Sequence, residues 1–360
     1  MKKIFITAVL LSSSFLVKAQ YVGLNNTEVG KLKQLIEADA GVRAMYKNYE
    51  AIADASLNVS PNPIDTILSE GKLEGDPKKT ATAFALKDIQ KIYTSALVYK
   101  LYGDKEYLKN AVQYLLAWAK LNKSKGDPID DTNLDGAIEA YDMLKGNINA
   151  ANNTVITDWF KQVAAAEIKT WKPNKETGYN NWNSHRLKVM GEIAYAINDP
   201  ELQKFTVDGL KKQIEVNLYA DGSGVDFKLR DALHYHAYDL EPLLKLAIVL
   251  KRATGVDYYT YVSDKQSSIK KSVEWFLPYI TGEKTHGEFV NSTVAFDKKR
   301  AMNGQAEYKA GTLFKPANGL KTLGLAGYFD PQYLTVIQKV KATDKTYPDW
   351  QAVLNKVMLQ

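Results

Sequence analysis

Apolar residues recur at intervals of three and four positions along most of the chain. Leu32, Leu35 and Ile36 are followed by Val42 and Met45 at the same spacing, whereas strict alternation of apolar and polar residues is rare. Intervals of three and four place side chains on one face of an α-helix. The pattern therefore predicts a mostly helical protein.

The helices predicted after residue 80 share this spacing and are joined by short polar turns such as Gly103-Asp104. They cover residues 82–102, 105–122, 131–145, 151–170, 182–197, 200–217, 230–253, 257–278, 299–312, 317–326, 331–341 and 347–358. No linker rich in proline or serine divides residues 20–360, so we expect one domain there. Successive helix pairs of about 40 to 50 residues favour an all-α fold, an incomplete (α/α) toroid or barrel of antiparallel helical hairpins.

Two long polar segments interrupt the helical pattern, at residues 58–80 and 281–298. The first contains Lys72, Lys78 and Lys79. Loops of this length within a domain often serve as lids or binding loops, although some are merely mobile. Lys72 is therefore a candidate contact for an acidic ligand, and a solvated run of charge is the alternative.

The first 19 residues have the features of a signal peptide. Lys2 and Lys3 precede an apolar run over residues 4–16, and Val17-Lys18-Ala19 resembles a cleavage site. We expect cleavage after Ala19 and a periplasmic or secreted product. The chain has no cysteine, so neither a lipid-modified cysteine nor a disulfide is available. No later stretch reaches the roughly 18 uncharged apolar residues of a membrane span, so we expect no membrane insertion.

The charge balance argues against a nucleic-acid partner. The chain carries 47 Lys and Arg against 41 Asp and Glu, a net charge of +6, and removing the three lysines of residues 1–19 leaves +3. The basic residues are dispersed, so we expect no nucleic-acid binding. A local cationic groove for an acidic polymer is compatible with the composition, and the oligomeric state is left open.

The four histidines are the first indication of chemistry, and all lie in the second half of the chain. One of them ends a polar and aromatic run made of Tyr179, Asn180, Asn181, Trp182, Asn183, Ser184 and His185. A helix N-cap explains one asparagine, because its side chain accepts hydrogen bonds from free backbone N–H groups. Three asparagines with a tryptophan and a histidine exceed what a cap requires.

The second cluster begins at Arg230 and contains two more histidines. Arg230, His234 and Tyr238 are spaced i, i+4 and i+8, so on one helix they would project from nearly the same face. Tyr235 flanks this row as a candidate contact, as does His236. The alternative is that Tyr235 and His236 are buried and serve packing.

Several enzyme classes lack their motifs in this sequence. There is no His-Glu-x-x-His zinc motif, no Asp-x-Asp-x-Asp-Gly calcium loop, no Gly-x-Ser-x-Gly elbow and no glycine-rich phosphate loop. His234 and His236, two positions apart, would point to different faces of a helix and chelate poorly. We therefore expect neither a metal nor another cofactor.

Asn, His, Arg and Tyr side chains together suit β-elimination on a uronic acid. The C5 proton lies next to a carboxylate, which resists a second negative charge unless hydrogen-bond donors or cations stabilise it. Asn amides, a protonated His or Arg supply those donors. A Tyr or His then removes the proton, and a Tyr protonates the departing O4 oxygen.

The same residues carry a resemblance to a known family. The run 180–185, followed by Tyr238 within 232–243, resembles the alginate-lyase domain, and within it the polysaccharide lyases of families 5 and 38. Weaker similarity covers 128–142 and 285–300. The resemblance implies an incomplete α/α toroid with a groove, and an enzyme that cleaves 1,4-linked polyuronate, alginate above all, leaving an unsaturated uronyl end.

The resemblance also implies roles for individual residues. Tyr238 would be the general acid, and also the base for syn elimination. His185 would neutralise the carboxylate together with Asn181 or Asn183, assisted by Arg230, or would instead be the base for anti elimination. The remaining candidates are substrate contacts, with aromatic rings for stacking on sugars and polar groups along the groove: Tyr179, Asn180, Trp182, His234, Tyr235, His236, His286, Arg300 and Lys72.

Two departures from the family 5 pattern leave alternatives open. Three residues stand between Asn181 and His185 where that family has none, and Asp231 occupies the position of the expected arginine. Both features suit a family 38-like branch, for which glucuronan is a substrate alongside mannuronan. A glycoside hydrolase using carboxylates among Asp130, Asp131 and Asp135 is a second interpretation, and a non-catalytic glycan-binding protein is a third.

Overall fold

The computed structural model describes residues 20–359. The predicted signal peptide, residues 1–19, lies outside the described residues. The described chain folds into an α/α toroid, which confirms the predicted fold class, and its only strands are the two-residue pair β1 (Gly287–Glu288) and β2 (Thr312–Leu313).

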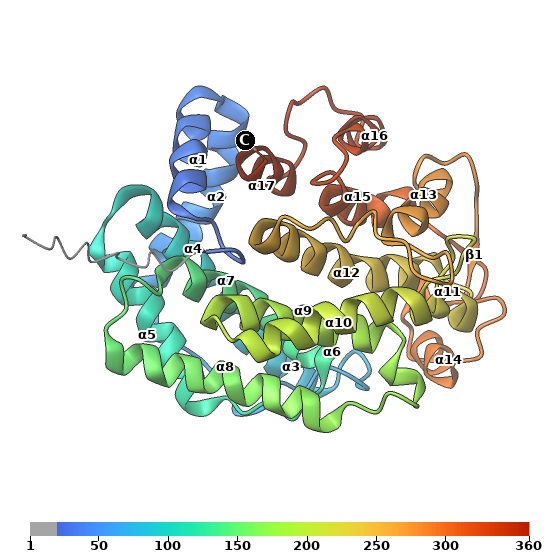
Figure 1. Cartoon of the computed structure of the whole chain (residues 1–360), viewed down its shortest axis with the longest axis horizontal. Coiled ribbons are helices and arrows are strands. Elements are labelled where there is room, and N and C mark those ends of the chain that lie inside the picture. Colours follow the sequence, from blue (N-terminus) through green and yellow to red (C-terminus); the bar gives the residue numbers. More distant parts are fainter. Residues whose placement is uncertain (1–19, 360) are drawn as a thin grey trace, which may run out of the picture.

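The helices follow one another around the ring in Figure 1. The α-helices are α1 (Asn26–Ala38), α2 (Ala40–Ser56), α3 (Pro77–Ala85), α4 (Lys87–Tyr102), α5 (Lys105–Leu121), α6 (Pro128–Asp131), α7 (Asp135–Leu144), α8 (Ala150–Thr170), α9 (Asn181–Ile197), α10 (Pro200–Asn217), α11 (Val225–Arg230), α12 (Leu233–Thr254), α13 (Ile269–Ile280), α14 (Ala295–Met302), α15 (Leu320–Ala326), α16 (Gln332–Val340) and α17 (Trp350–Met358). The 3₁₀ turns are η1 (Thr132–Leu134), η2 (Glu176–Gly178), η3 (Ala306–Tyr308) and η4 (Pro316–Gly319).

Neighbouring helical hairpins pack side by side around the ring, and α9 and α12 contact each other most extensively. α9 packs most extensively against α12 and α10, and α4 packs against α2, α5 and α7. The C-terminal helix α17 lies beside α1 and also contacts α2, so the two ends of the described chain meet (Figure 1).

Polar caps set many helix starts. Asn25 forms a capping box with Glu28 at the start of α1, and Asp39, Asp104 and Asp199 cap α2, α5 and α10. In each case the cap side chain accepts hydrogen bonds from backbone N–H groups that have no partner within the helix.

Helix α9 is buried along almost its whole length, because other helices surround it. Its apolar residues join the main core, yet it also carries Arg186, Lys188 and Glu192, all buried. Buried charges need partners. Arg186 pairs with Glu167 of α8 at 2.9 Å, whereas Lys188 and Glu192 face the interior of the ring.

Several predicted helices differ from the observed ones; 82–102 is divided between α3 and α4, and 131–145 becomes η1 and α7. The predicted 230–253 helix is broken at Asp231, whose φ of 49° lies in the left-handed region, so α11 ends at Arg230 and α12 starts at Leu233. In place of 257–278, a loop precedes α13. In place of 299–312, helix α14 ends at Met302, and Gly304 then takes a φ of 85°.

The first long polar segment packs beside the end of α14, which follows the second segment. The carbonyl of Glu74 accepts a hydrogen bond of 3.1 Å from Asn303 Nδ2, just after α14. The first segment is also anchored where the Asp130 carboxylate accepts from Ser69 and from the backbone N–H of Glu70. These contacts hold the first segment against the toroid.

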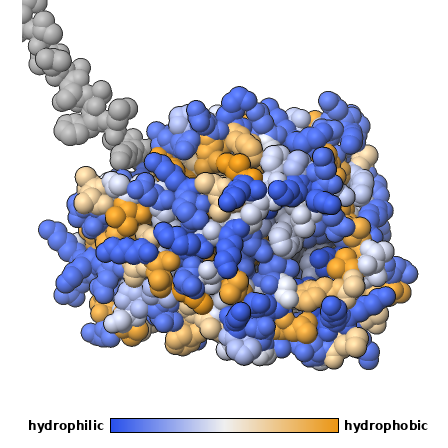
Figure 2. All heavy atoms as spheres, turned by 90° about the horizontal axis from the view of Figure 1, so that it is seen from below, coloured by the Kyte–Doolittle hydropathy of each residue, from blue (hydrophilic) through white to orange (hydrophobic). Residues whose placement is uncertain are grey.

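The outer surface is mainly polar on the face drawn in Figure 2, where hydrophobic residues lie in small scattered groups. That face therefore presents no broad apolar patch of the kind that marks a partner or membrane interface. Among residues 20–359, no helix combines the length and apolar character needed to cross a membrane.

Candidate active site

A cavity of about 480 Å³ lies within the ring, between α7, α9, α12 and the C-terminal helices. Each of the three central elements contributes polar side chains at helical spacing. They are Thr132, Asp135 and Glu139 from η1 and α7, His185 and Lys188 from α9, and Tyr238, Glu241 and Lys245 from α12. Residues one and two turns apart on a helix share a face, so each helix turns one polar stripe toward the cavity.

His185 and Tyr238 meet on the wall of this cavity. Their ring centroids are 4.4 Å apart with an interplanar angle of 41°. His185 is 6% exposed. Burial raises the pKa of Tyr238, since the phenolate would lose its hydration, and the nearby Glu70 and Glu241 carboxylates act in the same direction.

The ring of His185 is oriented by Thr132. The Thr132 hydroxyl lies 2.9 Å from Nδ1, whereas Nε2 is buried and makes no hydrogen bond of good geometry with the described residues. Burial lowers the pKa of His185 to about 3, and the neighbouring Lys188 ammonium acts in the same direction. The lowered pKa favours the neutral form of the imidazole at neutral pH.

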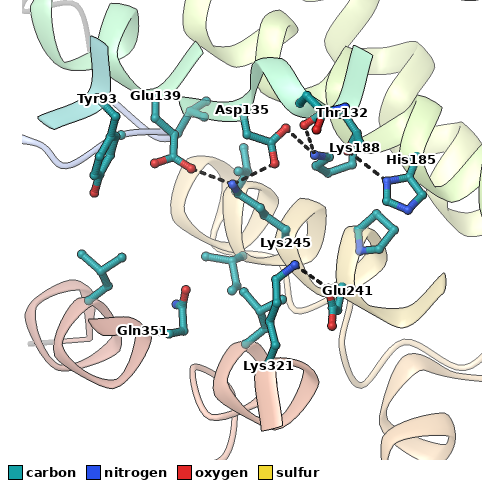
Figure 3. A pocket seen from close by; sticks show the side chains of 18 of the residues that line it. Tyr93, Thr132, Asp135, Glu139, His185, Lys188, Glu241, Lys245, Lys321 and Gln351 are labelled. Carbon is teal, nitrogen blue, oxygen red and sulfur yellow. Dashed lines mark hydrogen bonds and ion pairs between the residues drawn. The ribbon is translucent and has the colours of Figure 1, made fainter. Parts of the chain in front are cut away.

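A charged cluster forms the floor of the cavity beyond His185, as Figure 3 shows. Lys188 pairs with Asp135, and the Lys245 ammonium lies 3.2 Å from Asp135, 2.6 Å from Glu139 and 3.4 Å from Glu192. Burial of Glu192, together with the Asp135 charge, raises its pKa to about 8. With Glu192 protonated, two lysines face two carboxylates and the floor is close to neutral.

The protonation of this cluster follows from its contacts. Burial alone would raise the pKa of Asp135, but Lys188 and Lys245 outweigh it and hold that pKa well below its usual range. Burial would likewise lower the pKa of Lys245, and the surrounding carboxylates raise it instead. Lys245 is thus held as a cation within the cavity.

A further ion pair stands at the rim. Lys321 of α15 lies 2.6 Å from Glu241, and its side chain is 76% exposed. Figure 3 places this pair on the side of the cavity opposite Asp135 and Lys188. An anionic ligand at the rim therefore meets an exposed, solvated ammonium group.

The asparagines of the first motif point away from the cavity. Asn180 is the N-cap of α9 and accepts from the Trp182 N–H at 3.0 Å. Asn181 donates its amide and its backbone N–H to Asp226, and the Asn183 amide donates to Gln213 at 2.7 Å. Burial raises the pKa of Asp226 to about 6. As they stand, these amides tie α9 to α10 and α11.

Two aromatic residues of this motif also lie outside the cavity. The carbonyl of Tyr179 accepts from Gln213 and Asn217 at 3.1 and 3.0 Å, which joins the start of α9 to α10. Trp182 is half-buried and does not line the cavity, and neither does Lys72 in the first long segment.

The prediction that Arg230, His234 and Tyr238 project from one face of a single helix is wrong. Because the chain turns at Asp231, Arg230 does not share a helix with His234 and Tyr238. The Arg230 guanidinium instead lies 3.8 Å from the ring centroid of Tyr235 and 2.6 Å from Asp297. It contacts the neighbour of Tyr238 rather than the cavity.

The rest of the second motif forms an aromatic cluster behind Tyr238. His234 stacks on Tyr235 at 4.4 Å, and Tyr235 meets Tyr238 edge to face at 6.2 Å. Arg300 donates to the Tyr235 hydroxyl at 2.5 Å. Burial and the two arginines lower the pKa of His234 to about 4. These residues brace Tyr238 from the side away from His185.

His236 and His286 do not line the cavity. His236 is fully buried, and its Nε2 donates to the Ser272 carbonyl at 3.2 Å, so the predicted substrate contact there is wrong. The His286 Nε2 lies 3.0 Å from the Asp231 carbonyl and 3.3 Å from its carboxylate. His286 thus stabilises the turn at Asp231.

The carboxylates named for a hydrolase are fully engaged. Asp130 binds the first long segment, Asp131 accepts from Ser124, and Asp135 is held between two lysines. Asp130 and Asp131 do not line the cavity. No pair of these groups is placed as a free acid and a free base on either side of a bond.

The sequence patterns did not predict the charged residues that form the floor of the cavity. Their signal was nonetheless present, because Lys188 and Glu192 follow His185 at i+3 and i+7 in a part of the helix that is apolar after Arg186 apart from these two residues, and Lys245 follows Tyr238 at i+7. Polar residues on the same face as a candidate catalytic residue were the useful pattern.

Comparison with known proteins gives the family. The family model described as alginate lyase matches residues 37–286. The chain is 22% identical over 193 residues to an exo-oligoalginate lyase of Saccharophagus degradans, and 28% identical over 169 residues to a polysaccharide lyase of Stenotrophomonas maltophilia. These matches cover 48% and 44% of this chain, but only 26% and 50% of the two relatives.

Solved structures share the fold. An alginate lyase from Bacteroides ovatus superposes with a TM-score of 0.68 at 16% identity, covering 93% of this chain and 98% of that one. Alginate lyase A1-III from Sphingomonas species A1 gives 0.55 at 19% identity, covering 84% and 95%. The family model spans well over half of the chain, and the protein therefore belongs to the alginate lyase family.

Proposed function

We propose that this protein is an exported lyase that cleaves 1,4-linked polyuronate, with polymannuronate as the preferred substrate, by β-elimination. The observation that carries the proposal is the contact between His185 and Tyr238 at 4.4 Å on the wall of a cavity that also holds three lysines. Export rests on the signal-like residues 1–19 and places the enzyme in the periplasm or outside the cell.

The two side chains divide the proton transfers between them. When Nδ1–H donates to Thr132, the lone pair of neutral His185 is on Nε2, which is buried, so the ring turns or the wall opens for this atom to accept the C5 proton. The phenol of Tyr238 stays protonated until the O4 oxygen departs and then donates to it. An anionic substrate raises the pKa of both groups, which improves His185 as a base and keeps the proton on Tyr238.

The charge that develops on the substrate carboxylate needs a positive environment. Asn181, Asn183 and Arg230 are committed to Asp226, Gln213 and Asp297, so in this proposal they do not supply it. Lys188 lies on the His185 wall and Lys321 at the rim. Lys188 faces the cavity while paired with Asp135, and its potential stabilises the aci-carboxylate, whereas the exposed Lys321 attracts the anionic polymer at the rim.

The choice of substrate follows from the relatives. A relative is named an exo-oligoalginate lyase, and two variants of alginate lyase A1-III, one with a tyrosine replaced by phenylalanine and one with a histidine replaced by alanine, have structures with a tetrasaccharide. Alginate contains mannuronate, which supports polymannuronate as the first substrate to test. Glucuronan, the substrate suggested by the motif spacing, is the second.

The test is the ultraviolet absorbance of the conjugated uronyl product. Purified protein is incubated with polymannuronate, polyguluronate and glucuronan in parallel, with EDTA in one set. We expect absorbance to rise fastest on polymannuronate and to survive EDTA. New reducing ends without absorbance would select a hydrolase, and binding without either signal would select a glycan-binding protein.

A further inference from the structure

The cavity continues past its charged floor into a second hollow of about 430 Å³. The two share six lining residues along α4, η1, α7, α12 and α17: Tyr93, Asn133, Asp135, Glu139, Lys245 and Leu354. Figure 3 shows Tyr93 and Gln351 at the opposite end of the cavity from His185. The groove thus extends well beyond the catalytic pair.

Three half-buried aromatic residues surround the second hollow. Tyr49 of α2 lies 4.7 Å from Trp350 of α17 and 6.2 Å from Tyr93 of α4, measured between ring centroids. Exposed Gln90 and Asn133 stand beside them on the lining. Aromatic faces with amide groups at their edges are suited to a sugar, which has apolar C–H faces and a rim of hydroxyls.

We propose that Tyr49, Tyr93 and Trp350 form a distal subsite that stacks on a uronate unit of the bound chain, away from the bond that is cleaved. This inference rests on the proposed function. From Thr132, which contacts His185, to Glu139 at the edge of the hollow, α7 and its preceding turn rise roughly 10 Å at about 1.5 Å per residue. That separation exceeds one pyranose ring.

The position of Trp350 comes from the C-terminal part of the chain. It is the first residue of α17, fixed there because the N-cap Asp349 accepts from the Ala352 N–H at 3.0 Å and pairs with Lys341 at 3.2 Å. Residues 37–286 match the family model, so Trp350 lies outside the match while Tyr49 and Tyr93 lie within it. The distal subsite therefore joins the matched domain to a C-terminal helix that completes it.

If the three aromatic rings serve only packing, replacing one of them should have a different effect than if they bind a sugar. If they only join α2 to α17, replacing one lowers stability and affects substrates of every length equally. If they stack on sugar, the loss appears only with chains long enough to reach them. Comparing short and long substrates at the same concentration of folded protein therefore distinguishes the two roles.

The experiment measures kcat and KM by product absorbance for Trp350→Leu on polymannuronate and on the shortest oligomannuronate that the wild type cleaves. We expect the polymer KM to rise roughly 3- to 10-fold, the range of one aromatic contact, with constants on the short oligomer unchanged. Trp171→Leu is the matched control, because Trp171 packs against Phe205 on the outside of the ring.

Each remaining outcome is decisive. Equal changes on both substrates, or none, overturn the distal subsite. If Trp350→Leu does not fold, Gln90→Ala at an exposed lining position gives the same length test with little structural risk. If the wild type cleaves no polyuronate, the proposed function fails instead, so the two failures are distinguishable.

Discussion

The two motifs that stand out in the sequence differ in how they reach the cavity. The first, residues 179–186, opens a buried helix and sends only His185 inward, while its asparagines tie α9 to α10 and α11. The second, residues 230–238, is broken at Asp231 and sends only Tyr238 inward, while its other rings brace that tyrosine. Each motif thus supplies one residue that lines the cavity, and its other residues hold the surrounding structure in place.

The largest expected effect comes from the two residues that do reach the cavity. Tyr238→Phe and His185→Gln should each lower kcat by about 10²- to 10⁴-fold, the usual value of a general acid or base, with little change in stability. Tyr235→Phe is the matched control one turn earlier on α12, since its hydroxyl accepts from Arg300 and faces away from the cavity. Product absorbance gives the rates.

The contrast between the two tyrosines is what this comparison tests. An equal loss in Tyr235→Phe and Tyr238→Phe would mean that the aromatic cluster, and not one hydroxyl, carries activity. Full activity in Tyr238→Phe would remove the assigned general acid altogether.

The next prediction distinguishes a structural role from a catalytic role for an asparagine of the first motif. Asn181→Ala leaves the buried Asp226 carboxylate without one of its two donors, which should lower the free energy of unfolding by about 1 to 3 kcal/mol. Urea unfolding measures that loss, and kcat per folded molecule should change far less. Normal stability with a collapsed kcat would instead place the Asn181 amide on the substrate.

The sequence predicts the helical ring because residues close together in the chain form the apolar face of each helix, as in the apolar stretch 240–250 of α12. It does not predict the break at Asp231, because the partners that hold this left-handed residue lie far along the chain. The Asp231 carbonyl accepts from the Phe289 N–H at 2.7 Å, and its carboxylate accepts from the Asn291 N–H at 2.9 Å. His185 and Tyr238 were found because they are rare types in dense motifs, whereas Lys188 and Glu192 resemble ordinary surface residues until the fold buries them.

A smaller effect concerns the charged floor, which lies outside both motifs. Folded Glu192 holds its proton up to about pH 8, well above the ordinary value of 4.5, so its stabilising contribution is full below that ordinary value and is lost as the pH rises through 8. The unfolding free energy of the wild type should therefore fall between about pH 5 and 8 and level off above that range. Glu192→Gln, which cannot ionise, should show a shallower fall in urea unfolding at pH 5, 6, 7 and 8.

Glu167 provides an internal reference for that slope. Burial raises its pKa to about 9 at a separate site beside Asp131, so it contributes equally in the wild type and in Glu192→Gln. Identical slopes in the two proteins would mean that Glu192 is already ionised at pH 7 and that the floor is net negative.

The smallest expected effect lies at the rim, where the motifs contribute nothing. Lys321→Gln removes an exposed ammonium paired with Glu241, and the KM for polyuronate should rise about 2- to 5-fold with kcat nearly unchanged, as expected for an exposed charge. The difference from wild type should shrink as salt is added, because salt screens solvated charges. Lys204→Gln, which removes an exposed lysine paired with Asp208 on the outside of the ring, is the control. A fall in kcat, or a KM effect that salt leaves intact, would move Lys321 from steering the polymer to direct contact with the carboxylate that reacts.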